Sequence, residues 1–182
     1  ITDHLGRFCG FGGRIFKTND QRSKYYNSHE SPHFSKGSLV FGLDRAKTAI
    51  AQKEQVFLVE GYIDCIMMAQ QGYTNTVATL GTTCTLEHLH TLSHYAQRLY
   101  LLYDGDQAGK QAIVRLTPLC WQVNIDPYVI QLPAGQDPAS FLSQGNDLTP
   151  YYDQAQDIFQ FFLQQLGMDF ITAGTQKKLE LI

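Results

Sequence analysis

The feature that most constrains the fold is an alternation of short apolar runs with amphipathic stretches, which begins at residue 55. Four runs are predicted to be buried strands: 55–61, 75–81, 98–106 and 126–133. The stretches between them have helical spacing, and such an alternation is typical of βαβ units. The sequence therefore predicts a parallel sheet with helices on its faces. Right-handed crossovers bring the carboxyl ends of the strands to one edge, where open α/β sheets bind ligands.

Local signals delimit the predicted helices. Gly72 is expected to end the first helix of the series in the C-cap position. Thr83 or Thr85 is able to cap the second one. A further helix is predicted over 41–52, ahead of the first strand, with three apolar residues on one side: Leu43, Ala46 and Ile50.

The two flanks of this series differ from it. Residues 1–37 are irregular and β-rich: 8–16 suit a short strand with tight bends, and 17–37 are expected to form a surface loop. Residues after 141 are polar, then aromatic and helical. Their helical spacing predicts three packing residues: Phe159, Phe162 and Leu166. The chain opens with Ile1 and stops inside a helical pattern, so we expect it to be a piece of a longer protein.

Length and composition limit the classes of protein. A chain of 182 residues with 43% apolar residues suits one domain, or one domain and part of another. No run reaches the eighteen or so apolar residues of a membrane span, and no signal peptide is predicted. The four cysteines form no CxxC pair. This pattern argues against a structural zinc site and favours a reducing cytoplasm.

Charge is distributed unevenly along the chain. Residues 1–50 carry eight Lys and Arg against four acids, whereas residues 51–182 carry six against thirteen. A basic segment followed by an acidic one is typical of proteins with nucleic-acid partners. A solvated basic loop is the open alternative.

Acidic side chains follow two of the predicted strands. Glu60 closes the first strand, Asp64 follows one helical turn later, and Asp104 and Asp106 follow the third strand. Asp104 and Asp106 are two residues apart in an extended segment, so both side chains are expected to project to the same side. A hard cation such as Mg2+ relieves the repulsion between clustered carboxylates and often recruits phosphate. The motifs thus predict metal-assisted chemistry on phosphates, although Asp64 alone also suits the first turn of a helix and 104–106 alone suit a turn.

The motifs EGYID at 60–64 and DGDQAGK at 104–110 resemble the Toprim signature of topoisomerases, primases and related nucleases. Other motifs follow the order seen in bacterial DnaG-type primases, and the resemblance covers nearly the whole chain. They are FGGR at 11–14, SKYYNSHES at 23–31, FSKG at 34–37, FGL at 41–43, LGT at 80–82 with His88 downstream, and GQDP at 135–138.

This resemblance implies a division of the chain. Residues 1–53 would be the end of a basic N-terminal subdomain, 54–142 a Toprim domain, and 143–182 a truncated helical segment. The implied activity is synthesis of short RNA primers on single-stranded DNA from ribonucleoside triphosphates, in the cytoplasm. An RNA–DNA hybrid would be the product, and the cofactor would be Mg2+, with Mn2+ able to substitute. Zinc and the replicative helicase would be bound by domains that are absent from this chain.

The resemblance also assigns roles to residues. The catalytic set is Glu60, Asp104 and Asp106, and the metal set is Glu60, Asp104, Asp106, Asp64 and Asp137. The set that binds nucleic acid or nucleotide is Arg14, Lys24, Tyr25, Asn27 and Lys36. Glu60 is interpreted as the proton acceptor. The family usually has a second acid at the position of Ala139, so the number of metals stays open. Lys110 is either within reach of a phosphate or an ordinary exposed lysine.

Three other functions remain to be weighed. A Toprim nuclease or topoisomerase-like domain is disfavoured by the motifs at 23–28 and 34–37. An aspartyl phosphohydrolase with Asp104 as nucleophile leaves Glu60 unexplained. A module that binds metal or nucleotides, but performs no chemistry as an isolated fragment, is the alternative that is not an enzyme.

Overall fold

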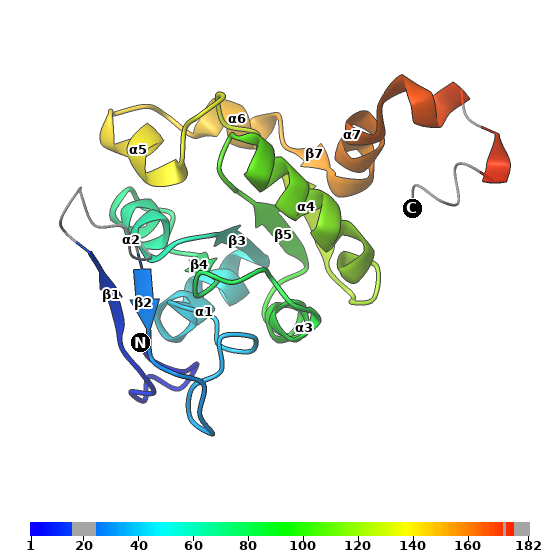
Figure 1. Ribbon diagram of the computed structural model, residues 1–182. Coiled ribbons are helices and arrows are strands. Elements are labelled where there is room, and N and C mark those ends of the chain that lie inside the picture. The colour runs from blue at the N-terminus through cyan, green and yellow to red at the C-terminus, as the bar shows by residue number, and fades with distance from the viewer. Residues whose placement is uncertain (16–24, 173, 177–182) are drawn as a thin grey trace.

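The computed structural model describes residues 1–15, 25–172 and 174–176 and is built around one five-stranded sheet (Figure 1). The strand order is β4-β3-β5-β6-β7. Its strands are β3 (Gln55–Val59), β4 (Thr76–Ala78), β5 (Arg98–Leu101), β6 (Asp126–Val129) and β7 (Gln156–Asp157). The first four are parallel to one another, which confirms the four predicted strands and the Toprim-like α/β class. β7 pairs antiparallel with β6 and was not predicted, because two residues carry no periodic signal.

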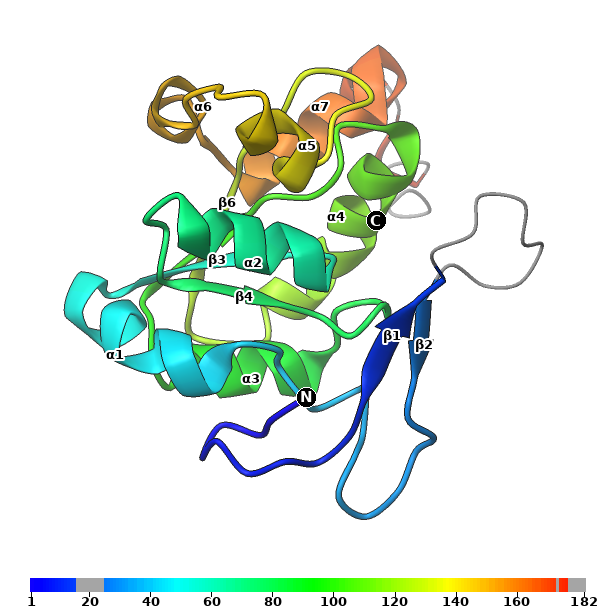
Figure 2. The same ribbon diagram turned by 90° about the vertical axis from the view of Figure 1, so that its left-hand side faces the viewer.

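Helices cover both faces of the sheet (Figure 2). They are α1 (Leu43–Lys53), α2 (Tyr62–Gln70), α3 (Leu86–Ser93), α4 (Gln107–Cys120), α5 (Pro138–Ser143), α6 (Thr149–Asp153) and α7 (Ile158–Thr172). Side chains alternate across each strand, so Val56 and Leu58 pack with α1, α3, α4 and α7. Phe57 and Val59 pack on the opposite face with α2, α5 and α6. With both faces covered, the strands are apolar almost throughout, as expected for a parallel sheet.

The helix ends match most of the local signals. α1 buries Leu43, Ala46 and Ile50, which confirms the predicted packing side. Thr85 caps α3, and its hydroxyl accepts a hydrogen bond from the His88 backbone N–H at 3.2 Å. α2 is capped by Gln71, and Gly72 follows one residue later with φ 91°. The left-handed glycine therefore stops the helix from just beyond the cap.

A second, smaller sheet lies beside the α/β body (Figure 2). Its two antiparallel strands are β1 (Gly12–Arg14) and β2 (Tyr25–Asn27). β2 falls within 17–37, where only loop was predicted, so that expectation was wrong at this point. Its three residues acquire strand structure by pairing with β1, a contact that no local pattern encodes.

The C-terminal part corrects one packing prediction. Phe159 is 50% exposed, whereas Phe161 is fully buried and Phe162 is buried as predicted. α7 follows directly after β7, and this junction sets which aromatic side faces the core. Within the described residues, no helix is long and apolar enough to cross a membrane.

Candidate active site

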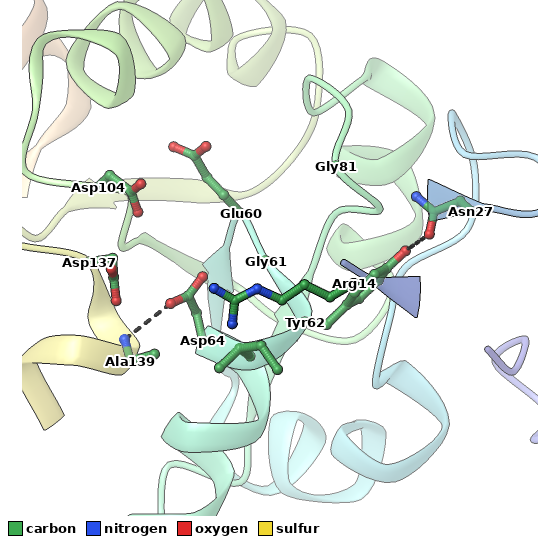
Figure 3. A pocket seen from close by; sticks show the side chains of 11 residues that line it. Arg14, Asn27, Glu60, Gly61, Tyr62, Asp64, Gly81, Asp104, Asp137 and Ala139 are labelled. Carbon is green, nitrogen blue, oxygen red and sulfur yellow. Dashed lines mark hydrogen bonds between the residues drawn. The ribbon is translucent and has the colours of Figure 1, made fainter. Parts of the chain in front are cut away.

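Acidic side chains gather in a cavity of about 380 Å³ at the carboxyl edge of the parallel sheet (Figure 3). Glu60 directly follows β3, and Asp104 follows β5, its neighbour in the sheet. Asp64 comes from the first turn of α2, and Asp137 from the start of α5. The other polar side chains that line the cavity are Arg14, Asn27 and Tyr62. Adjacent parallel strands thus bring together four of the five carboxylates that the sequence assigns to the metal.

Glu60 is the most perturbed of these acids. Burial raises its pKa to about 7, and the charges of Asp104, Asp106 and Asp64 raise it further, against a hydrogen bond from the Asp104 backbone that lowers it. Its Oε1 atom is buried and has no hydrogen-bond partner among the described residues. A buried oxygen without a donor is costly. The position therefore favours a proton or a cation beside this carboxylate.

Asp64 is held by the backbone of another element. Its Oδ1 accepts a hydrogen bond from the Ala139 N–H at 3.0 Å, which joins α2 to α5. Burial raises the pKa of Asp64, and the charge of Asp137 adds to this effect. Gly61 leaves room for the carboxylate, because an added Cβ would lie 2.7 Å from Asp64 Oδ2. The backbone of Gly61 is extended, so a close approach rather than a special turn favours glycine here.

Asp104 and Asp106 do not act as the equivalent pair that their spacing predicts. Asp104 lines the cavity, whereas Asp106 is exposed and does not line it. The Asp106 carboxylate caps α4 and accepts from the Gly109 N–H at 2.8 Å. Its charge still reaches Glu60 and raises the pKa of that group. The helix begins where an extended strand was assumed, and this redirects the second carboxylate.

Two glycines allow this turn. A Cβ on Gly109 would lie 2.2 Å from the Asp104 carbonyl oxygen, and a Cβ on Gly105 would lie 2.4 Å from the Pro133 carbonyl oxygen. Both contacts are with backbone, which cannot rotate away. The glycines of the DGDQAG motif therefore fix the path that carries Asp104 into the cavity.

Asp137 also has a structural task. It caps α5 and accepts from the Ser140 N–H at 2.6 Å, while the Ser140 hydroxyl pairs with the Asp137 backbone. It nevertheless lines the cavity beside Asp64 (Figure 3). A carboxylate fixed by a helix cap is pre-oriented toward its neighbours, which suits a supporting position.

The donor set fits a hard divalent cation. Carboxylate oxygens are the ligands that Mg2+ prefers, and their mutual repulsion raises the pKa of Glu60. Among the described residues, no group of three or more His, Cys, Asp or Glu side chains is already placed to hold an ion. The cap of Asp106 and the separate orientation of Glu60 account for this, since they spread the oxygens apart.

The basic side of the cavity comes from the small sheet. The Arg14 side chain extends from β1 toward Asp64 (Figure 3). Asn27, on β2, donates to the Leu80 carbonyl oxygen at 2.8 Å. Lys36 is half-buried and does not line this cavity, and its backbone N–H donates to Glu30 at 3.1 Å. Lys24 and the side chain of Tyr25 lie outside the described residues.

Tyr62 is a cavity residue that the sequence interpretation missed. Its hydroxyl donates to Asn27 Oδ1, and its ring packs on Phe41 with 4.8 Å between centroids. Burial raises the pKa of the phenol. Its position within the EGYID motif, between two assigned acids, was the available signal. Tyr62 thus connects the small sheet to the helix that carries Asp64.

The fold and the acidic edge define a Toprim-like protein. Residues 57–142 match the family model described as Toprim-like. Residues 1–47 match the model described as the DNA primase catalytic core, N-terminal domain. The chain belongs to the bacterial DnaG-type DNA primases.

Relatives and solved structures agree with this assignment. The DNA primase of Chlamydia pneumoniae is 37% identical over 185 residues, covering 100% of this chain and 31% of that protein. A crystal structure of a DNA primase domain from Pseudomonas aeruginosa has a TM-score of 0.86 at 35% identity, covering 100% of this chain and 58% of the other. A DnaG primase catalytic domain bound to single-stranded DNA has a TM-score of 0.84 at 30% identity, with 100% and 59% covered. The chain spans about a third of the length of such curated relatives.

Proposed function

We propose that this chain is the metal-dependent nucleotidyl-transfer part of a primase that makes short RNA primers on single-stranded DNA. The observation that carries the proposal is the cavity in which Glu60, Asp64 and Asp104 meet Arg14 at the carboxyl edge of the sheet. Membership of the Toprim and primase families implies a divalent metal in general. Mg2+ is the proposed ion, with Mn2+ as a substitute.

The acidic residues have distinct tasks in this proposal. Glu60 and Asp104 bind the metal directly, and Glu60 also accepts the proton of the attacking 3′-hydroxyl. A group whose pKa lies at about 7 is suited to exchanging a proton near neutral pH. Asp64, Asp106 and Asp137 support the metal from positions fixed by helix starts. The bound metal supplies polarisation of the α-phosphate and lowers the pKa of the 3′-hydroxyl.

The basic residues hold the phosphates of the substrates. Arg14 reaches into the cavity from an exposed strand, where its guanidinium suits bidentate contacts with a triphosphate. Asn27 fixes the strand beside it, and Lys24, Tyr25 and Lys36 extend the binding surface. Their proposed partners are ribonucleoside triphosphates, the DNA template and the RNA–DNA hybrid. These contacts position strands without reading bases.

The rest of the proposal concerns the whole protein. Residues 1–53 form the end of the basic subdomain, 54–142 the Toprim domain, and 143–182 a helical segment. Zinc and the replicative helicase engage other domains of the full protein, which acts in the cytoplasm.

Extension of a pre-annealed RNA primer tests this function. The chain is incubated with a primed single-stranded DNA template, labelled ribonucleotides and Mn2+, beside the Asp104→Ala variant. Supplying the primer removes the need for initiation by other domains. We expect template-directed extension by the wild type and none by Asp104→Ala.

Two other outcomes separate the competing functions. Mn2+ binding that depends on Asp104, without extension, would identify a metal-binding module that needs the rest of the protein. Cleavage of the template instead of extension would identify a nuclease. Extension that survives in Asp104→Ala would refute the assigned site.

A further inference from the structure

A second cavity opens on the other side of Glu60. It has a volume of about 470 Å³ and shares Glu60 and Gly81 with the first cavity. Its walls are the loop after β4, with Thr82 and Thr83, and the exposed side of α4, with Arg115. Arg14, Asp64 and Asp137 line only the first of these two cavities. Glu60 is therefore accessible from two sides that differ in their neighbours.

The polar groups of the second cavity are hydrogen-bond donors with no assigned task. Arg115 is exposed, and its side chain forms no hydrogen bond or ion pair with any described residue. The hydroxyls of Thr82 and Thr83 likewise have no partner in the described part of the chain. Ala108 and Ala112, on the side of α4 facing the cavity, leave its middle open. A guanidinium and two hydroxyls around a small open space suit a phosphate group.

The charge distribution makes Arg115 unusual in its part of the chain. Residues 51–182 carry six basic residues against thirteen acids. Lys53 donates to Asn75 at 3.1 Å, and Arg98 interacts with Tyr100 at the amino edge of the sheet, away from the acids. Lys177 and Lys178 lie outside the described residues. The remaining two, Lys110 and Arg115, both belong to α4, next to the acidic site.

These two cations share a crevice that continues from the second cavity. Arg115 lines both spaces, and Lys110 joins it in a crevice between α4 and α7. Three glutamines complete the polar lining of that crevice: Gln107, Gln111 and Gln165. Five residues along a helix span about 7.5 Å, close to the rise of two phosphates at about 3.4 Å each along one nucleic-acid strand. The crevice thus has the spacing and chemistry of a backbone track.

We propose that the second cavity and this crevice form a phosphate site for a polynucleotide strand, with Arg115 as its central contact. The inference rests on the proposed function, because nucleotidyl transfer needs two substrates on opposite sides of the reacting phosphate. The nucleotide occupies the Arg14 side of Glu60. The strand that ends at the reacting 3′-hydroxyl runs along α4, where Arg115 and Lys110 contact its phosphates.

Equilibrium binding of two ligands tests this site. The 182-residue chain is titrated with a fluorescent RNA–DNA hybrid bearing a single-stranded DNA overhang, and separately with ATP, each with Mg2+. The variants are Arg115→Gln, Arg115→Lys and, as a matched control, Arg98→Gln, which removes the same charge at the opposite edge of the sheet. The hybrid titration is repeated at salt concentrations from about 50 mM to about 200 mM.

We expect Arg115→Gln to bind the hybrid about three- to fivefold more weakly, as one exposed charge contact implies. The slope of log affinity against log salt should fall by about 0.7 to 0.9, which corresponds to one lost phosphate contact. Arg115→Lys should retain most of the affinity, and Arg98→Gln should match the wild type. Affinity for ATP should not change in any of the three variants.

Each other result overturns the assignment. Loss of ATP affinity with unchanged hybrid binding would assign the phosphate to the nucleotide. Equal hybrid binding by Arg115→Gln and Arg98→Gln, or a wild type that binds no hybrid, would remove the site. Primer extension that depends on Asp104 tests the proposed function separately. Extension without an Arg115 effect refutes only the strand track, and an Arg115 effect without extension refutes only the function.

Discussion

The acidic edge of the large sheet and the small β1–β2 sheet contribute to one cavity with different physical support. Glu60 and Asp104 follow strands buried on both faces, and Asp64 and Asp137 are fixed by helix starts. β1 is exposed along its whole length, and contacts such as the one from Asn27 to Leu80 attach its sheet to the body. Chemistry that needs fixed oxygens is thus carried by the core. Phosphate binding, which tolerates adjustment, is carried by a segment with little buried surface.

Loss of an acid from the fixed edge should have the largest effect. Asp104→Asn keeps the size of the side chain but removes a proposed metal ligand. Since loss of supporting residues already costs about 10- to 100-fold, we expect primer extension to fall by more than about 100-fold. The melting temperature without metal should not fall, because a charge leaves a repelling cluster. Extension rates and thermal denaturation of the same preparation measure both effects.

The second prediction addresses the link between the two regions. Asn27→Ala removes the hydrogen bonds to Leu80 and Tyr62, so Arg14 is less well positioned. We expect about a tenfold rise in KM for nucleotide, with a smaller change in kcat. Tyr26→Phe is the control, since its side chain is a half-exposed neighbour on the same strand. A fall in kcat alone would show that the small sheet takes part in the chemistry rather than in binding.

The third prediction uses the pKa of Glu60, which is raised from 4.5 to about 7. Between these values the folded state retains a proton that the unfolded state has released, so the free energy of unfolding falls as pH rises. Glu60→Gln removes this loss. With EDTA at about pH 8, the variant should be about 1 kcal/mol more stable after allowing for screening by solvent, or about 2–4 °C in Tm.

A pH series separates this effect from a general change in packing. At about pH 4.5 the Glu60→Gln variant and the wild type should melt together, because Glu60 is then protonated in the folded state and largely so in the unfolded state. An equal gain at both pH values would mean that the amide simply packs better. A loss of stability at about pH 8 would contradict the assigned burial of the charge.

The same comparison explains how much the sequence predicted. The four parallel strands and the burial of Ile50 follow from local periodicity, because a strand or helix covered by a core repeats its apolar residues regularly. The pairing of β2 and the two-residue β7 depend on contacts between distant segments. At the site, proximity of Glu60 and Asp104 follows from parallel topology. The separate direction of Asp106 depends on where α4 begins, and helix boundaries are the part of a sequence pattern that is least well determined.

The smallest predicted effect concerns Ala139, where the family usually has an acid. Its side chain lines the cavity, and its backbone N–H holds Asp64. Ala139→Asp should tighten Mn2+ binding by about three- to tenfold, because another carboxylate joins the donor set. It should also lower stability without metal by about 0.5 kcal/mol, through repulsion of Asp64. Ala139→Asn separates charge from size and should change neither quantity in the same way. Calorimetric titration with Mn2+ and melting in EDTA measure the two terms. If the aspartate leaves Mn2+ affinity unchanged, the ion lies nearer Glu60 and Asp104 than Asp64, and α5 acts only through its backbone.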